Sequence, residues 1–479
     1  MNSNLSNPLE TLTKDETIRL REQHIGKSCT LFFKDDPLKI VKGDGQYMYD
    51  ESGNKYLDCI NNVAHVGHSN PHVTRAAARQ MSLIYTNSRY LHDAMVVYAK
   101  RLTQYFPEQL SICYFVNSGS EANDLALRLA RAHTQHKDVI THDAAYHGHL
   151  TNIVEISPYK FTKIKGHKKK NWVHVAPLPC NYRGKYNKDK HFDDEKIGKL
   201  YAREVASLIE TAEEKGRHIA AFISESMISC GGQVIPPKGY LKEVYRLVRA
   251  AGGVCIADEV QVGFGRIGSS MWAFQHPSND VIPDIVTLGK PIGNGHPVSC
   301  VVTTPEIAAS FEGLGAEYFN TFGGNPCSMA IANAVLDVIE RDNLMGQASI
   351  VGSFLIENLN DLANSYPVIG DVRGCGLFIG VELVRDRTSK RPASHLAEWV
   401  VRRFRDSGII MSTEGKYSNV LKFKPPMTFN LDDARNWINV FTSIMKQIES
   451  EDKLFISSSS SSLTSISSVD SLLPSGEEF

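Results

Sequence analysis

The chain has 479 residues, of which 42% are hydrophobic and 22% are charged, as is usual for a globular protein of two or three domains. Lys and Arg number 52 against 53 Asp and Glu, so the net charge of -1 gives no overall attraction to nucleic acid or to an anionic membrane. No apolar run approaches the roughly 18–20 residues that cross a bilayer, which argues against a membrane-spanning protein.

Cysteine usage and the first residues bear on the compartment. The 9 cysteines are an odd number and include no Cys-x-x-Cys pair, which favours a reducing compartment over a disulfide framework or a zinc ribbon. The first residues include Glu10, Asp15 and Glu16 and no apolar core, so they do not resemble a secretory signal. They also match a mitochondrial presequence poorly, because Arg19 is the first arginine and acidic residues precede it.

The hydrophobic pattern predicts strands that alternate with helices along most of the chain. An early strand is expected at residues 46–49. Between about residues 110 and 325, buried strands are expected at 219–223, 254–257 and 285–288, and an amphipathic helix at 241–248. This alternation predicts an α/β fold with a mostly parallel sheet, covered by helices on both faces, that binds ligands beyond the carboxyl ends of its strands.

The C-terminal third is interpreted as a second, smaller α+β domain. It contains a strand-like segment at 377–381 and a helical stripe from Leu396 to Phe404, and the early strand could join it. Serine dominates residues 457–479, which should be disordered because they have little to bury. The predicted division is an N-terminal segment contributing to the small domain (1–62), a large cofactor-binding domain (63–335), the small domain (336–452) and a disordered serine-rich tail (453–479).

Four features of the large domain could carry chemistry. The turn that contains Gly119 and Ser120 precedes a strong helix and could bind a phosphate, although such a turn alone is more often only a helix cap. Tyr146 offers an aromatic face for stacking. Asp258 follows an apolar strand, where its carboxylate could contact a cationic ring nitrogen or simply cap a loop. Lys290 follows another strand, where a desolvated amine would be a Schiff-base nucleophile, although an exposed loop lysine is the simpler interpretation.

Taken together, these four features fit pyridoxal phosphate. Its chemistry needs a cradle for the phosphate, a face against the ring, a carboxylate that keeps the ring nitrogen protonated and an amine for the aldehyde. Two other patterns carry less weight. His65, His68 and His72 lack acidic or cysteine partners at metal-ligand spacing, so no metal site is expected. Residues 263–268 fit Gly-x-Gly-x-x-Gly, but no convincing helix follows, so no dinucleotide site is expected.

The features in this order resemble the class III (ω-type) aminotransferase family, whose members are pyridoxal-phosphate enzymes of fold type I. The resemblance extends from about Leu20 to about Ser450. It implies a large domain with a mostly parallel sheet and a small α+β domain. The motifs that carry it are Asn-Ser-Gly-Ser-Glu-Ala-Asn at 117–123, Tyr-His-Gly at 146–148, Asp-Glu-Val-Gln-Val-Gly-Phe-Gly-Arg at 258–266, Leu-Gly-Lys at 288–290 and Asn-Thr-Phe-Gly-Gly-Asn-Pro at 320–326.

The resemblance also implies roles for single residues. Lys290 would bind the cofactor aldehyde and move the substrate proton, Asp258 would pair with the ring nitrogen, and Tyr146 would complete the catalytic set. Thr321 would reach the phosphate bound by a neighbouring subunit, so a homodimer or a homotetramer is expected. The other implied cofactor contacts are Gly119 and Ser120 at the phosphate, Val260 on the ring face opposite Tyr146, Gln261 near the 3-hydroxyl and Glu225 near the substrate.

One position departs from the family. Many members carry an arginine ahead of a Pro-Pro pair, where it binds the substrate α-carboxylate, whereas this chain has Lys422 there. A point charge in place of a bidentate fork weakens the case for ordinary amino-acid transamination. Four segments are instead similar to a phospho-lyase branch of the family, and their motifs are nearer to enzymes of ethanolamine phosphate; they are 59–68, 225–227 with 230–233, 289–297 and 421–427.

The branch implies β-elimination of phosphate from phosphoethanolamine, giving acetaldehyde, ammonia and phosphate. Lys422 and Arg266 are the expected substrate contacts, and Lys424 and His65 are weaker candidates. The alternatives are 5-phosphohydroxy-L-lysine as substrate, an ω-aminotransferase that uses an amine and a keto acid, and a pseudoenzyme or assembly module. The branch also implies the mitochondrial matrix, with the cytosol as the alternative, and neither a nucleic-acid nor a membrane partner is expected.

Overall fold

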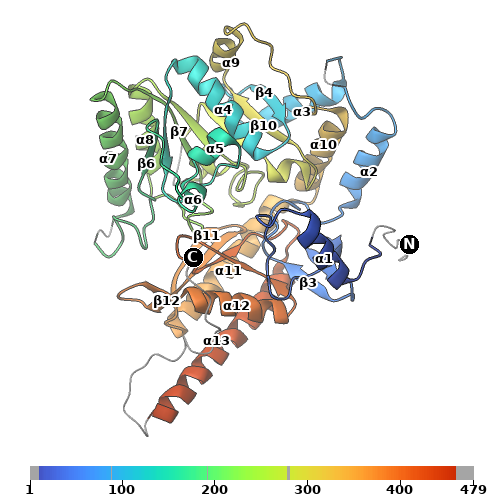
Figure 1. Cartoon of the computed structure of the whole chain (residues 1–479), viewed down its shortest axis with the longest axis vertical. Coiled ribbons are helices and arrows are strands. Elements are labelled where there is room, and N and C mark those ends of the chain that lie inside the picture. The colour runs from blue at the N-terminus through green and yellow to red at the C-terminus, as the bar shows by residue number, and fades with distance from the viewer. Residues whose placement is uncertain (1–9, 88, 191–192, 278–280, 460–479) are drawn as a thin grey trace.

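The computed structural model describes residues 10–87, 89–190, 193–277 and 281–459. Figure 1 shows a large sheet with its helices in the upper half of the molecule and two smaller sheets in the lower half. Among the described residues, no helix combines the length and the apolar character needed to cross a bilayer.

The large sheet has seven strands in the order β4-β10-β9-β8-β7-β5-β6. The strands from β9 to β6 are parallel, whereas β10 runs antiparallel to both β9 and β4. The predicted mostly parallel sheet is therefore confirmed. Its strands are β4 (Ile112–Val116), β5 (Asp138–His142), β6 (Val173–Ala176), β7 (Ile219–Glu225), β8 (Val254–Asp258), β9 (Ile285–Leu288) and β10 (Ser299–Thr303).

Helices bury both faces of this sheet. Ile223 and Ile256 pack in a core with α4, whereas their neighbours Phe222 and Cys255 pack in a core with α7 and α8. Successive side chains of a strand point to opposite faces, so the continuous apolar runs are buried on both sides. The helices of this half are α2 (Pro71–Met81), α3 (Asp93–Thr103), α4 (Gly119–Thr134), α5 (Thr151–Glu155), α6 (Pro158–Phe161), α7 (Asp194–Glu213), α8 (Tyr240–Ala250), α9 (Pro305–Glu312) and α10 (Pro326–Arg341).

Segments from the N-terminal and C-terminal parts of the sequence meet in the lower half. There, β3 pairs in parallel with β14, so that Leu57 lies opposite Ile409. The early strand, β2, is the neighbour of β3 and therefore belongs to the same sheet as β14. The four-stranded sheet contains β1 (Ile40–Asp44), β2 (Tyr47–Asp50), β3 (Lys55–Asp58) and β14 (Ile409–Ile410); the five-stranded sheet contains β11 (Ile369–Cys375), β12 (Phe378–Asp386), β13 (Arg391–Pro392), β15 (Ser412–Glu414) and β16 (Val420–Phe423).

Four long helices complete the lower half (Figure 1): α1 (Lys14–His24), α11 (Leu344–Ser365), α12 (Ser394–Asp406) and α13 (Leu431–Ser459). The end of α13 differs from the predicted boundary of the tail at residue 453. The helix continues to Ser459, because adding residues to an existing helix is much easier than starting one. The rest of the predicted disordered tail, residues 460–479, lies outside the described residues.

Candidate active site

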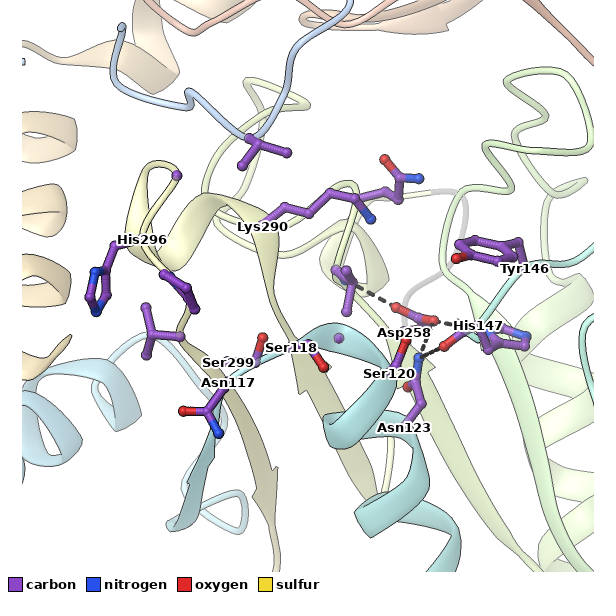
Figure 2. A pocket seen from close by; sticks show the side chains of 18 residues that line it. Asn117, Ser118, Ser120, Asn123, Tyr146, His147, Asp258, Lys290, His296 and Ser299 are labelled. Atoms are coloured by element: carbon purple, nitrogen blue, oxygen red, sulfur yellow. Dashed lines mark hydrogen bonds and ion pairs between the residues drawn. The ribbon is translucent and has the colours of Figure 1, made fainter. Parts of the chain in front are cut away.

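Four loops at one edge of the large sheet form a cavity of about 240 Å³. They follow β4, β5, β8 and β9, and they bring Ser120, Tyr146, Asp258 and Lys290 to its wall (Figure 2). The carboxyl ends of these strands lie at the same edge, which is where open α/β sheets bind their ligands. Residues that are far apart in the sequence therefore lie together, as expected if each of them follows the carboxyl end of a strand.

The turn at the start of α4 forms one end of the cavity. Ser118 caps the helix by accepting a hydrogen bond from the main-chain N–H of Glu121 (3.2 Å). A Cβ atom added to Gly119 would lie only 2.8 Å from Cγ1 of Val260, so only glycine lets the helix approach that side chain. The first N–H groups of a helix have no partner within it and carry partial positive charge, so this turn can bind an anion such as a phosphate.

Asp258 ends β8 as a carboxylate that is fixed on both oxygens. Its Oδ2 accepts hydrogen bonds from Nδ1 of His147 (2.7 Å) and Nδ2 of Asn123 (2.9 Å), and its Oδ1 accepts one from the N–H of Val260 (3.1 Å) (Figure 2). Asn123 is oriented in turn because its Oδ1 accepts from the Thr287 hydroxyl (2.7 Å). The carboxylate is therefore aimed before any ligand binds.

Asn123 and His147, the partners of Asp258, are not among the residues predicted from the sequence. Asn123 is a buried polar residue on the face of α4 that also buries Ala122 and Leu125. An amide among apolar neighbours at helical spacing was the one signal that could have pointed to it, because a buried polar group needs a hydrogen-bond partner.

Lys290 follows β9 and is the first residue of a short 3-10 helix, Lys290–Gly293. Its φ of +24° is an uncommon backbone conformation for a residue with a side chain, and such strain is often found at functional sites. Burial lowers the pKa of its ammonium group, although Asp258 opposes this effect. An amine with a lowered pKa is a better nucleophile and base near neutral pH.

Of the other predicted cofactor contacts, three line the cavity and one does not. Tyr146, Val260 and Gln261 line the cavity. Glu225 is buried and does not line it; its carboxylate accepts hydrogen bonds from the N–H groups of Tyr146 (3.5 Å) and Ser229 (2.9 Å). Burial, with a smaller contribution from Asp258, raises the pKa of Glu225 to about 7.

Two lysines from the small domain approach Lys290. Lys422 on β16 forms an ion pair with Glu414 on β15 (2.6 Å). Lys424 is almost fully buried, and its ammonium group donates hydrogen bonds to the Ser229 hydroxyl (2.8 Å) and to Oε1 of Gln261 (2.6 Å). Burial and the nearby charge of Lys422 lower the pKa of Lys424 well below its ordinary value. Lys424, the weaker of the two lysine candidates from the sequence, is thus the one bonded to a residue of the cavity wall.

Arg266 is not among the residues that line the cavity, and its expected contact with substrate stays a prediction. Its buried guanidinium donates hydrogen bonds to the main-chain carbonyls of Pro425 (2.8 Å) and Leu377 (3.1 Å), and it lies 3.3 Å from Nδ1 of His65. Burial lowers its pKa to about 9. These bonds tie the two halves of the molecule together, so the arginine has a structural role in this arrangement.

The clustered histidines are dispersed by the fold. His68 pairs with Asp58 and His72 with Asp337, each at 2.8 Å, whereas Nε2 of His65 lies 2.8 Å from the carbonyl of Phe264. In the part of the chain that the structure describes, no three His, Cys, Asp or Glu side chains are arranged to hold a metal ion.

Thr321 lies on an exposed loop and does not line the cavity of its own chain. Large apolar side chains are exposed on this loop and around the start of α3, including Phe319, Phe322 and Leu91. The contact of Thr321 with a second subunit stays a prediction.

Comparison with known proteins identifies the family. A family model described as "Aminotransferase class-III" matches residues 33–445. The chain belongs to this family. It is therefore an enzyme of the pyridoxal-phosphate-dependent class III group, with the expected α/β fold. The cofactor is pyridoxal phosphate, and the cavity fits it by offering an amine, a fixed carboxylate and a glycine-containing helix N-terminus.

Relatives within the family have different names. An "Alanine--glyoxylate aminotransferase 2-like" protein of Drosophila melanogaster is 55% identical and covers 92% of this chain and 89% of its own. "Ethanolamine-phosphate phospho-lyase homolog 1" of Caenorhabditis elegans is 43% identical, with coverage of 90% and 94%. A human relative at 35% identity, with coverage of 91% and 87%, is named "Alanine--glyoxylate aminotransferase 2, mitochondrial".

A solved structure gives a similar comparison for the fold. A phospholyase from Arthrobacter in complex with phosphoethanolamine superposes with a TM-score of 0.85 at 36% identity. The match covers 90% of this chain and 99% of that one. The fold and the cofactor are thus common to relatives named as lyases and as aminotransferases, so the reaction depends on the groups that meet the substrate.

Proposed function

We propose that this enzyme is a phospho-lyase that converts phosphoethanolamine and water into acetaldehyde, ammonia and phosphate. The observation that carries the proposal is that Lys422 and Lys424 lie close enough to Lys290 to act on it electrostatically. The resemblance to the family places an arginine at the position of Lys422 in many members. A lysine ammonium group suits a compact phosphate dianion but lacks the bidentate fork that suits a carboxylate.

Lys290 is the proposed base of the reaction. When bound, pyridoxal phosphate supplies an aldehyde that captures the substrate amine and a protonated ring that accepts electrons. The Lys290 amine then takes a proton from the substrate carbon next to nitrogen, which its lowered pKa favours. Asp258, held by His147 and Asn123, keeps the ring nitrogen protonated.

Phosphate leaves from the neighbouring carbon, and positive groups must meet the charge that develops on its oxygens. Lys422 can bind the phosphate once its ion pair with Glu414 opens. Lys424 is hydrogen-bonded to Gln261 of the cavity wall. Since elimination returns the cofactor as its aldehyde, no keto acid is consumed. The water molecule enters only in the last step, when the released product hydrolyses to acetaldehyde and ammonia.

The test is phosphate release from phosphoethanolamine by the protein loaded with pyridoxal phosphate, with no keto acid present. We expect phosphate and acetaldehyde to appear in equal amounts. Release of phosphate from 5-phosphohydroxy-L-lysine alone would keep the chemistry and change the substrate. Absence of release from both compounds would overturn the proposal.

The second candidate function is an aminotransferase reaction, which the name of the 55% identical Drosophila relative favours. In that case an amine and a keto acid would exchange their nitrogen, and a product amino acid such as alanine would accumulate when pyruvate is added. A loaded protein that turns over neither way would support the pseudoenzyme alternative.

A homodimer or a homotetramer is proposed from the exposed apolar surface that surrounds Thr321. Leu91 and Tyr90 are 101% and 84% exposed, and Phe322 on the Thr321 loop is 61% exposed. Large apolar side chains exposed on neighbouring segments are typical of an interface, and these segments are neighbours because the Arg89 guanidinium lies 4.3 Å from the centre of the Phe319 ring. Leu91→Glu should therefore shift the assembly toward monomers in analytical ultracentrifugation, and Thr321→Ala should weaken cofactor binding without changing the assembly.

The name of the human relative includes the word "mitochondrial". On this basis the mitochondrial matrix is proposed as the compartment. Fractionation of cells that produce the tagged full chain tests this, and recovery in the cytosolic fraction would favour the alternative.

A further inference from the structure

The orientation of the Gln261 amide is determined by its two partners. Its Oε1 accepts hydrogen bonds from Nζ of Lys424 (2.6 Å) and from Nδ2 of Asn62 (3.1 Å). The Asn62 amide group that faces Oε1 also faces the main-chain carbonyl of Gln261, which can only accept, so this group is the NH2 and the Gln261 amide atom opposite it must be the oxygen. The NH2 group of Gln261 is consequently on the other side of the amide.

Both partners are themselves held in place. Lys424 also bonds the Ser229 hydroxyl (2.8 Å), which donates to Oε1 of Gln233 (2.9 Å). The Asn62 amide makes a second contact, to the main-chain carbonyl of Gln261 (3.3 Å). A buried network in which every member is bonded resists rotation of any one side chain.

The NH2 group of Gln261 meets no protein acceptor within the described ranges, although Gln261 lines the cavity. A donor that faces the cavity is free to bond an acceptor of the ligand that fills it. Asp258 marks the ring nitrogen, Lys290 marks the aldehyde and the α4 N-terminus marks the phosphate. In pyridoxal phosphate, the ring carbon that carries the aldehyde lies between the ring carbon that carries the phosphate arm and the ring carbon that carries the hydroxyl. Gln261 is tied to Asn62 and Lys424 in the lower half of the molecule, away from α4, which places its donor on the hydroxyl side.

We propose that Asn62 and Lys424 are positioning residues that turn the NH2 group of Gln261 toward the ring hydroxyl oxygen of pyridoxal phosphate and so make that oxygen a weaker base. A hydrogen bond from a fixed donor stabilises the deprotonated oxygen. The inference concerns the cofactor, so it stands whether the reaction is phosphate elimination or amino transfer.

The visible absorption band of the loaded protein tests this, because its pH midpoint reports the basicity of the ring hydroxyl oxygen together with the Lys290 nitrogen bound at the cofactor aldehyde. We expect Lys424→Met and Asn62→Ala each to raise the midpoint by up to about one pH unit, as expected for the loss of one hydrogen bond. Gln261→Glu should raise it as well, because the carboxylate keeps the contact with Lys424 but presents no donor. Far-ultraviolet circular dichroism and cofactor content show that each variant is folded and loaded.

Removal of the Lys424 charge could also change the pKa of Lys290 directly. Asp258, Glu225 and Lys422 influence that pKa as well. A double-mutant cycle separates the two effects, since those groups are the same in every variant. If Lys424 acts through the amide, Lys424→Met should add almost nothing in the Gln261→Leu background. The proposal would be overturned if Lys424→Met shifted the pH midpoint equally in the Gln261→Leu background. It would also be overturned if Asn62→Ala, which changes no charge, left the midpoint where it is.

Discussion

The two walls of the active site are built from different parts of the molecule. The cofactor wall takes Asp258 and Lys290 from loops at one edge of the seven-stranded sheet. The proposed substrate wall takes Lys422 from β16 in the five-stranded sheet and Glu414 from β15 beside it. Each wall therefore comes from one sheet, and the two walls face a common site only when the two halves of the molecule meet.

The walls also treat charge differently. On the cofactor wall, Asp258 is surrounded by the neutral side chain of Asn123 and by His147, so its charge remains available to a cationic ring nitrogen. On the substrate wall, Lys422 is already neutralised by Glu414. A ligand at this second wall must displace an internal partner, which makes selection among anions possible there.

The strongest test of the cofactor wall is Lys290→Ala. Loss of both the nucleophile and the base should reduce phosphate release by at least about 10³-fold, and the visible band of the loaded protein should be lost. Lys199→Ala is the matched control, because that lysine lies on the surface of α7 with its side chain 66% exposed. Persistent release from Lys290→Ala would remove Lys290 from the reaction.

Asp258→Asn should have the next largest effect. The amide keeps the size of the side chain but has no charge to hold the proton on the ring nitrogen, so we expect kcat to fall by about 10²–10³-fold. The adjacent Glu259→Gln is the control. Glu259 bonds the Ser226 hydroxyl (2.6 Å) and two N–H groups of the Ala273–Gln275 helix, so its change should lower stability and leave kcat intact. Equal loss of kcat in both variants would contradict a special role for Asp258.

A paired comparison tests the substrate wall. Lys422→Met should lower kcat/KM for phosphoethanolamine by about 10–100-fold, because a charged hydrogen bond to the phosphate is lost. Lys422→Met combined with Glu414→Gln avoids leaving Glu414 as a buried, unpaired carboxylate. Arg266→Met should act differently, since it leaves the carbonyls of Leu377 and Pro425 without a donor and lowers the free energy of unfolding by about 1–3 kcal/mol for each.

Steady-state kinetics and urea unfolding of the same preparations distinguish a substrate contact at Lys422 from a structural role of Arg266. If Arg266→Met raised KM without loss of stability, Arg266 would return as a substrate contact. If Lys422→Met left kcat/KM unchanged, the phosphate would have to be held by other groups.

The cofactor wall could be predicted because its signals are local. Apolar runs followed by Asp258 and Lys290 indicated strand ends, and parallel strands bring their carboxyl ends to one edge. The helix after Ser118 was evident from the spacing of its apolar residues. The fold class followed from the same alternation of strands and helices.

The substrate wall could not be predicted in this way, because its contacts join distant segments. Nothing in the local sequence of Arg266 shows that its partners are the carbonyls of Leu377 and Pro425, more than a hundred residues away. The pairing of Lys422 with Glu414 depends on the register of two antiparallel strands, in which Glu414 lies opposite Val420. The hydrogen bond from Lys424 to Gln261 requires both halves of the molecule at once.

Glu225 connects the two walls through hydrogen bonds, and its substitution has the smallest expected effect of these predictions. It accepts hydrogen bonds from Tyr146 on the cofactor wall and from Ser229, whose hydroxyl bonds Lys424. Its pKa of about 7 lies above the roughly 4.3 of an exposed glutamate, so the folded chain binds more protons than the unfolded chain between these values. The free energy of unfolding contributed by this residue is therefore full below about pH 4.3, falls as the pH rises to about 7 and then changes no further.

Glu225→Gln removes this titration, so unfolding of the cofactor-free chain should lose less stability between acidic and neutral pH, by on the order of 1–3 kcal/mol. The slope with pH is the readout, because a glutamine that fails to accept both N–H bonds lowers stability equally at every pH. Glu259, whose pKa burial also raises to about 7, titrates in the same window, and Glu259→Gln should flatten the profile by its own share. An unchanged slope in Glu225→Gln would mean that this carboxyl group is ionised in the folded chain, and that the two walls are joined by a charge and not by a neutral acid.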